Sequence, residues 1–361
     1  MGEVRHSWEV PASWEHALAA ARQGGTLLLV GSVDSGKSTL AAILAQEAWR
    51  AGRATAVVDA DVGQASIGPP TCVSLGLVTQ EVERLDDLAP EAVDFVGSPS
   101  PMGHLLQCAT SAAAMVAAAG RAGAQTIVVD TTGLISGPAA RALKSAKIRL
   151  VGADAVIALQ AEDEVEHLLA PYAHRARPRV LRLGRSRRVK ARSREERTAR
   201  RQERLGAYFA NGRVFQARWG DLPMENTALT TGEPVPGHVR AHAEELLGCE
   251  VVYAERRADG VFVVVSGRPD QGGLRALGEG FGGTARACEV GSLENRLVGL
   301  LGEEGDTLAL GILESIDFPA RRLTIYTPLA DLEQARGLRM GAVQVARDGT
   351  QLAWNESGDV G

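Results

Sequence analysis

One nine-residue run, Gly-Ser-Val-Asp-Ser-Gly-Lys-Ser-Thr at positions 31–39, constrains this chain more than any other feature. It satisfies the pattern G-x-x-x-x-G-K-[ST] at every fixed position. The apolar residues 26–30 before it predict a buried strand, and the Ala- and Leu-rich residues 40–49 after it predict a helix. Strand, glycine loop and helix in this order indicate a phosphate-binding loop, because the N–H groups at the helix start point at an anion.

The residue types of this loop predict ATP and Mg²⁺ as ligands. Glycine permits dihedral angles and close approaches that a Cβ would block. Lys37 is expected to reach the β- and γ-phosphates, and the Ser38 hydroxyl to ligate Mg²⁺. The guanine-recognition pattern N-K-x-D is absent from the sequence, which argues against GTP. The expected nucleotide-binding residues are Gly31, Asp34, Ser35, Gly36, Lys37, Ser38 and Thr39.

The pattern of apolar residues predicts two domains. The 361 residues exceed the roughly 250–300 at which one core stops growing. Strands and helices alternate over the first two hundred residues, and continuous apolar strands predict a parallel sheet with helices on both faces, an α/β P-loop NTPase fold. From about residue 220, strands with turn residues between them dominate. We place the P-loop domain at residues 1–218 and a smaller, mainly β domain at 219–361.

Bulk properties favour a cytoplasmic protein. No stretch approaches the roughly 20 apolar residues that span a bilayer, so no membrane association is expected. Residues 1–10 lack the apolar segment of a signal peptide. The four cysteines show no paired spacing, which is typical of buried thiols in a reducing compartment.

A concentrated basic segment interrupts an otherwise acidic chain. Residues 175–204 hold thirteen arginines and Lys190 against three glutamates, a net charge of +11, whereas the whole chain carries −5. The alternative is a solvated basic helix. Because arginine suits bidentate phosphate contacts, we favour a local polyanion site.

Three aspartates end two of the predicted strands. Asp59 and Asp61 lie two residues apart and share a side-chain direction, and Asp130 ends residues 126–130. Carboxylates at this edge of a parallel sheet hold Mg²⁺ through water or accept a proton from an attacking hydroxyl. The residue pattern leaves open which acid contacts the metal. The motif described next favours Asp61, with Asp59 beside it, together with Ser38, and Asp130 is the competitor.

The ordered motifs resemble the polynucleotide 5′-hydroxyl kinases, the P-loop RNA kinases related to those of pre-mRNA 3′ processing, tRNA splicing and ribosomal RNA maturation. Residues 59–64, Asp-Ala-Asp-Val-Gly-Gln, are similar to the family's D-x-D-x-G-Q element. Residues 10–14 resemble its V-P-x-x-W lead-in, and residues 131–134, Thr-Thr-Gly-Leu, resemble its T-x-G-W clasp except at the last position. An arginine-rich helix precedes a Tyr-Phe pair, as in the family's lid, here at about residues 185–206.

The resemblance implies roles for individual residues. Lys37, Asp61, Arg197 and Arg201 are the expected catalytic residues, with the lid arginines contacting the phosphates. In the family the clasp Trp stacks on a substrate base, and Leu134 offers no such ring, so selectivity for the terminal base is expected to be weak. The expected substrate-binding residues are Gln64, Thr131, Thr132, Gly133, Leu134 and Arg204.

The sequence therefore predicts an ATP-dependent polynucleotide 5′-hydroxyl kinase that acts on the 5′-OH end of RNA, with DNA as a second acceptor. Protein partners are not indicated. The alternative from another class is a nucleotide-binding scaffold or RNA-processing assembly factor without kinase activity; the intact Lys37, Ser38, Asp61 and lid argue against it. A switch NTPase and a small-metabolite kinase are the remaining alternatives, and the arginine segment favours a larger polyanion.

Overall fold

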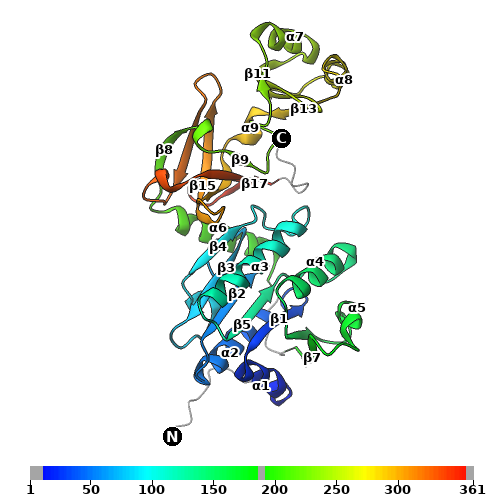
Figure 1. The fold of residues 1–361 in the computed structure, drawn as a ribbon, viewed down its shortest axis with the longest axis vertical. Helices are drawn as coiled ribbons and strands as arrows, with labels where there is room; N and C mark the ends of the chain where they lie inside the picture. The colour runs from blue at the N-terminus through cyan, green and yellow to red at the C-terminus, as the bar shows by residue number, and fades with distance from the viewer. Residues whose placement is uncertain (1–10, 186–191, 355–361) are drawn as a thin grey trace. The chain divides into compact units, whose positions relative to one another are not determined.

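The computed structural model describes residues 11–185 and 192–354. The chain divides into two units, Met1–Arg204 and Leu205–Gly361, which are considered separately (Figure 1). Val10 of the lead-in and residues 186–191 of the arginine segment lie outside the described residues.

A seven-stranded sheet forms the centre of the first unit, in the order β4-β3-β2-β5-β1-β6-β7. The five strands from β2 to β7 are parallel, and β3 and β4 extend the sheet in antiparallel fashion. The parallel part confirms the expected P-loop sheet. The strands are β1 (Gly25–Gly31), β2 (Thr55–Ala60), β3 (Cys72–Val78), β4 (Ala92–Phe95), β5 (Thr126–Thr131), β6 (Ala155–Gln160) and β7 (Arg179–Gly184).

Helices cover both faces of this sheet, as its apolar strands require (Figure 1). Leu27 and Leu29 of β1 belong to the core beneath α1 and α2, and Leu28 and Val30 belong to the core beneath α3 and α4. The helices are α1 (Glu15–Gln23), α2 (Lys37–Arg50), α3 (Leu105–Arg121), α4 (Gly137–Leu150), α5 (Glu166–Leu169) and α6 (Arg194–Phe209); short 3₁₀ turns are η1 (Ala12–Trp14), η2 (Leu85–Asp87) and η3 (Ala170–Tyr172). No described helix is long and apolar enough to cross a membrane.

The topology brings the predicted motifs to one edge of the sheet. β1 lies between β5 and β6, so the strand order reverses at the end of β1. Ligands of open α/β sheets bind in the crevice at such a reversal. The phosphate-binding loop follows β1, Asp61 follows β2, and Thr132 follows β5.

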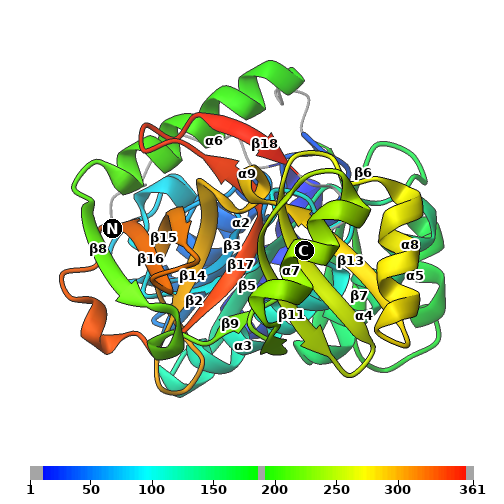
Figure 2. The same cartoon turned by 90° about the horizontal axis from the view of Figure 1, so that it is seen from above.

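The second unit is mainly β and contains two sheets (Figure 2). The larger sheet runs β18-β17-β14-β15-β16-β8, with β9 beside β17, and the smaller runs β10-β11-β12-β13 with α7 and α8 packed against it. The strands are β8 (Arg213–Arg218), β9 (Met224–Glu225), β10 (Glu233–Pro234), β11 (Glu250–Arg257), β12 (Gly260–Ser266), β13 (Thr284–Glu289), β14 (Arg296–Leu301), β15 (Thr307–Asp317), β16 (Arg322–Thr327), β17 (Gly337–Val345) and β18 (Gln351–Trp354). The helical elements are α7 (Gly237–Leu247), α8 (Gln271–Gly280), α9 (Val290–Leu293), η4 (Trp219–Asp221) and η5 (Leu332–Gln334).

The division between the units falls earlier than the expected 218/219. β8 (residues 213–218) pairs with β16 along its whole length, which places these residues in the sheet of the second unit. The end of α6 also belongs to this unit, because the Leu310 N–H of β15 donates to the Tyr208 hydroxyl at 2.8 Å. The Tyr326 hydroxyl donates to the Phe209 carbonyl at 3.0 Å.

Candidate active site

The phosphate-binding loop connects β1 to α2 and needs both of its fixed glycines. A Cβ on Gly31 would lie 2.6 Å from Ser35 Oγ and 2.7 Å from the Leu159 carbonyl. Gly36 has a φ of 94°, in the left-handed region. The loop therefore turns tightly enough for its backbone N–H groups to surround an anion, and its shape fits the polyphosphate of ATP.

Lys37 closes over this loop. Its Nζ donates to the Ser32 carbonyl at 2.7 Å, and the residue is 6% exposed. The ammonium group thus lies against the loop that would cradle phosphates, as the sequence predicts for a group that contacts the β- and γ-phosphates. The next residues, Ser38 and Thr39, are exposed at the start of α2.

Ser38 meets Asp130, the acid that the sequence analysis ranked second. Ser38 Oγ donates to Asp130 Oδ2 at 2.5 Å, and Asp130 Oδ1 accepts the Thr131 N–H at 2.8 Å. Asp130 is 1% exposed; burial raises its pKa, and nearby Lys37 opposes this rise. A hydroxyl beside a strand-end carboxylate is a donor set that suits Mg²⁺.

Asp59 shapes the loop that follows β2. Its Oδ1 accepts the Asp61 N–H at 3.1 Å, and its Oδ2 accepts the N–H groups of Ser66 at 2.5 Å and Ile67 at 3.0 Å. Burial raises the pKa of Asp59, and the neighbouring Asp130 raises it further. Backbone donors thus contact both Asp59 oxygens, and the expected metal role of Asp59 stays a prediction.

Asp61 begins the turn of the D-x-G-Q element. Its Oδ1 accepts the N–H groups of Gly63 and Gln64, both at 3.1 Å, while the residue remains half-buried. A Cβ on Gly63 would lie 2.7 Å from the Pro99 carbonyl, which explains the glycine. Gln64 Nε2 donates to the Gly63 carbonyl at 2.6 Å, and its Oε1 has no hydrogen-bond partner within the described ranges.

Residues 131–134 lie directly against the phosphate-binding loop. A Cβ on Gly133 would lie 2.5 Å from Val33 N and 2.6 Å from Val33 Cα. Thr132 is 4% exposed, and its Oγ1 lacks a partner in the part of the chain that the structure describes. Leu134 is half-buried and packs against the core beneath α3 and α4. The structure brings the expected clasp and the expected nucleotide site together.

Two acids hold the described part of the arginine lid. Asp34 of the phosphate-binding loop accepts Arg197 Nη2 at 2.6 Å and the Arg192 N–H at 3.1 Å through Oδ2. Arg201 Nη2 donates to Thr198 Oγ1 at 3.0 Å, and burial lowers the pKa of Arg201. Arg197 and Arg201 thus lie on the α6 segment that Asp34 ties to the loop.

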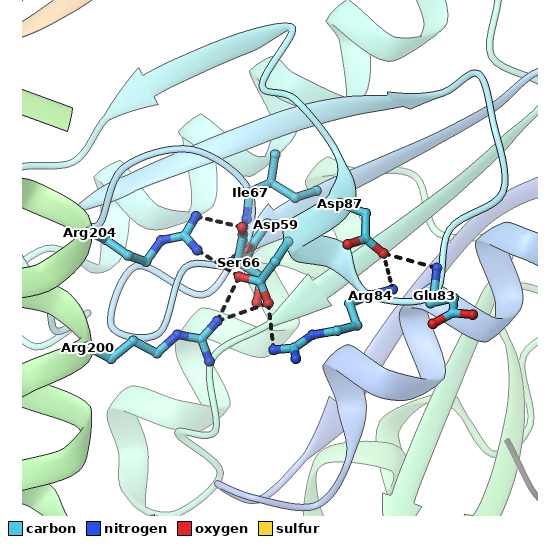
Figure 3. Close-up of polar contacts among 9 residues, drawn as sticks. Asp59, Ser66, Ile67, Glu83, Arg84, Asp87, Arg200 and Arg204 are labelled. Atoms are coloured by element: carbon cyan, nitrogen blue, oxygen red, sulfur yellow. Dashed lines mark hydrogen bonds and ion pairs between the residues drawn. The ribbon is translucent and has the colours of Figure 1, made fainter. Parts of the chain in front are cut away.

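The second acid is Asp86 of η2, which pairs with Arg200 at 2.8 Å and Arg204 at 2.7 Å. Arg204 also donates to the Ser66 carbonyl at 2.6 Å, beside Asp59 (Figure 3). A further bond goes to the Gly68 carbonyl at 2.9 Å. The described contacts of Arg204 go to two backbone carbonyls and a carboxylate, while its buried Nε has no partner among the described residues. Its expected role in substrate binding stays a prediction.

Other residues considered in the sequence lie inside the fold. Trp14 is 2% exposed in the core beneath α1 and α2, and its Nε1 donates to the Gly184 carbonyl at 3.1 Å. His104 is 1% exposed and precedes α3, with neither ring nitrogen partnered by a described residue.

Sequence reasoning missed two lysines, Lys144 and Lys147 of α4, which are fully buried beside these strand ends. The sequence did contain an indication that these lysines are buried, namely their positions in the helical repeat of α4. The buried residues of α4 follow the spacing i, i+3, i+4, i+7, i+8, and both lysines occupy positions of that apolar stripe. The stripe consists of Ala140, Leu143, Lys144, Lys147 and Ile148.

The fold and this site define a P-loop nucleotide-binding protein. Residues 31–211 match the family model described as the mRNA cleavage and polyadenylation factor CLP1 P-loop, and the chain belongs to this family. The polyribonucleotide 5′-hydroxyl-kinase of Methanocaldococcus jannaschii is 32% identical to this chain, over 98% of it and 96% of the relative. The enzyme of the same name from Pyrococcus furiosus is 30% identical over 96% of both chains.

Solved structures agree with the fold. The wild-type Clp1p–Pcf11p complex contains a chain that superimposes with a TM-score of 0.59 at 10% identity, covering 91% of this chain and 76% of that one. At this identity the likeness supports the architecture alone.

Proposed function

We propose that this protein is an ATP-dependent polynucleotide 5′-hydroxyl kinase, which transfers the γ-phosphoryl group of ATP to the 5′-OH end of RNA, with DNA as a second acceptor. One observation carries the proposal: the Ser38–Asp130 pair lies at the phosphate-binding loop, and the register of β2 with β5 sets Ala60, the residue before Asp61, beside Thr131. The nucleotide site and the Asp61 carboxylate thus lie at adjacent strand ends. Relatives of nearly the same length carry the same kinase name.

ATP and Mg²⁺ fit the residues present. The loop from Gly31 to Lys37 would hold the triphosphate, and Ser38 with Asp130 would hold the metal. Mg²⁺ held there would neutralise negative charge on the triphosphate. We assign the metal side to Asp130 in preference to Asp61 and Asp59, because Asp130 contacts the Ser38 hydroxyl and the Asp59 oxygens accept backbone donors.

Asp61 is the proposed general base. The turn holds its Oδ1 with two N–H groups, which fixes the direction of the carboxylate. A carboxylate within hydrogen-bond reach of the 5′-hydroxyl accepts its proton as the oxygen attacks the γ-phosphorus. Gln64 Oε1, with its free acceptor capacity, orients the same end of the substrate.

Cationic side chains supply the remaining catalysis. The transferring phosphoryl spreads negative charge over three oxygens, and Lys37, Arg197 and Arg201 are the cations that would stabilise it. Arg197 pairs with Asp34 in this structure, and exchange of that carboxylate for phosphate oxygens brings the arginine to the nucleotide.

The test measures transfer of labelled γ-phosphate from ATP to 5′-OH RNA and DNA oligomers, beside nucleosides and sugars. Wild-type protein should label the RNA, and Lys37→Ala should reduce kcat by at least about a hundredfold. ATP binding without transfer to any oligomer would contradict the kinase assignment and favour a nucleotide-dependent scaffold. Labelling of nucleosides in preference to oligomers would indicate a small-metabolite kinase.

A further inference from the structure

α4 contains two buried lysines to which the proposed mechanism gives no role. Lys144 is 1% exposed and Lys147 is 0% exposed. Fully buried lysines are rare unless they are paired, because the amine loses its water and must find other partners. The identity of those partners indicates what the two side chains do.

Lys144 joins two strand ends. Its Nζ donates to Thr131 Oγ1 at 2.6 Å and to the Thr132 carbonyl at 2.5 Å, both at the exit of β5. Thr131 Oγ1 in turn donates to the Leu29 carbonyl of β1 at 2.7 Å. This chain of hydrogen bonds runs from α4 across β5 to a point two residues before Gly31.

Lys147 holds the third strand end. Its Nζ donates to the Ala60 carbonyl at 3.1 Å, the residue directly before Asp61. Because β2, β5 and β1 are neighbours in the sheet, the two lysines connect one helix to three adjacent strand ends. Each of these ends leads into a different part of the site: the Asp61 turn, the Gly133 segment and the phosphate-binding loop.

The surroundings of the lysines are charged as well as buried. Burial lowers the pKa of both amines, and the carboxylates of Asp61 and Asp130 oppose this effect for each of them. The lysines are therefore near the acids of the site while their hydrogen bonds go to the strand ends. An apolar side chain of the same length would leave the carbonyls of Ala60 and Thr132 without these donors.

We propose that Lys144 and Lys147 are positioning residues for phosphoryl transfer, which fix the ends of β1, β2 and β5 and so set the spacing between the phosphate-binding loop and Asp61. The proposal rests on the proposed kinase function. Its physical basis is that reacting groups must be held in an attack geometry, and a misplacement of about 1 Å costs about a hundredfold in rate.

The kinetic test uses Lys144→Met, which keeps the length of the side chain and removes its donors. We expect kcat at saturating ATP to fall about tenfold or more, while the Kd for ATP stays within about twofold of the wild-type value. Arg149→Met is the matched control, because Arg149 is exposed on the last turn of the same helix. Its kcat should equal that of wild type.

A double-mutant cycle separates positioning from general loss of stability. Thr131→Val breaks the hydrogen-bond chain between Lys144 and Leu29 without removing a buried amine, and should lower kcat in the same direction. The double variant should be no slower than Lys144→Met alone, because both changes break one network. Should Lys144→Met fail to fold, Thr131→Val still decides: an unchanged kcat in that folded variant overturns the proposal. Additive losses also overturn it.

Hydrogen–deuterium exchange gives a readout that needs no acceptor substrate. Peptides that cover residues 129–136 should exchange faster in Lys144→Met, and peptides that cover residues 58–66 faster in Lys147→Met, than in Arg149→Met, while a peptide that covers residues 155–160 is unchanged. Exchange that is faster in all peptides alike, or unchanged in all of them, contradicts a positioning role. If wild-type protein transfers no phosphate, the kinase function fails, whereas the exchange pattern still decides whether the lysines fix the strand ends.

Discussion

The Ser38 hydroxyl donates to the Asp130 carboxylate across 2.5 Å, from the first turn of α2 to the end of β5. Asp59 and Asp61, at the end of the neighbouring strand, bind backbone N–H groups. The three acids at this edge therefore have three different environments, and their roles in the proposed mechanism separate accordingly.

The first prediction distinguishes Asp130 from Asp61. Asp130→Asn should raise the Mg²⁺ concentration required for half-maximal activity by about tenfold, since the hydroxyl of Ser38 loses its carboxylate partner. Asp61→Asn should lower kcat by about a hundredfold and leave the Mg²⁺ midpoint unchanged, because the base is lost and the metal ligands remain. Titration of activity with Mg²⁺ checks both variants. An Mg²⁺ midpoint that shifts in Asp61→Asn alone would reverse the assignment.

The second prediction concerns the contact of Gly133 with Val33. Gly133→Ala would place a Cβ 2.5 Å from Val33 N, well inside van der Waals contact, so the phosphate-binding loop must move. ATP affinity should fall at least about tenfold, measured by calorimetry or by a fluorescent nucleotide analogue.

Gly120→Ala is the control for this variant. Gly120 lies in α3 with an ordinary φ, and its Cβ would meet nothing within 4 Å. This change should leave ATP affinity unaltered and stabilise the helix by about 0.5–1 kcal/mol. Equal ATP affinity in the two variants would show that the loop tolerates the added methyl group.

The third prediction follows from the buried acid pair. Burial and the neighbouring Asp130 raise the pKa of Asp59 to about 7, from an ordinary value of 3.8. Between these values the folded protein holds a proton that the unfolded chain releases, so the free energy of unfolding falls as pH rises through that window. Asp59→Asn removes this titration. Its unfolding free energy, relative to that of wild type, should therefore increase by about 1–3 kcal/mol from pH 4.5 to pH 7.5.

Urea denaturation at several pH values measures this difference. The variant is expected to be less stable than wild type at pH 4.5, because the NH₂ group of the amide would face backbone N–H donors, whereas both oxygens of the Asp59 carboxyl group accept them. Parallel pH curves for the two proteins would refute the raised pKa.

The sequence predicted the parts of the fold that depend on local pattern. Residues 26–30 and 126–130 are continuous apolar runs, and they became β1 and β5, because a strand buried on both faces has few polar positions. β3 (Cys72–Val78) was not among the predicted strands. α7 and α8 were missed because the strands around them dominate the pattern of the second unit.

The site was harder to predict because it depends on register. Sequence places Asp59 and Asp130 at strand ends, but only the pairing of β2 with β5 sets them side by side. It also cannot show that Arg204 binds the carbonyls of Ser66 and Gly68, more than 130 residues away in the chain. Lys144 was predictable in principle, because a lysine in an apolar helical stripe needs an acceptor.

The last prediction concerns Leu134, at a position where the family that this chain resembles has tryptophan. Gly133 packs on the phosphate-binding loop, so the neighbouring side chain lies near the proposed nucleotide site while contacting the core beneath α3 and α4. Leu134→Trp adds a ring that stacks on a terminal base, and the KM for an RNA oligomer should fall about fivefold, corresponding to about 1 kcal/mol. The KM for ATP should remain unchanged.

Two controls make this result interpretable. Leu134→Ala removes core contact without adding a ring, so it should lower the melting temperature and leave the oligomer KM near that of wild type. RNA oligomers that differ only in the 5′-terminal base test selectivity: wild type should phosphorylate all four at similar rates, and Leu134→Trp should favour purines, which offer the larger stacking surface. A folded Leu134→Trp protein with unchanged oligomer KM would mean that position 134 does not contact the terminal base.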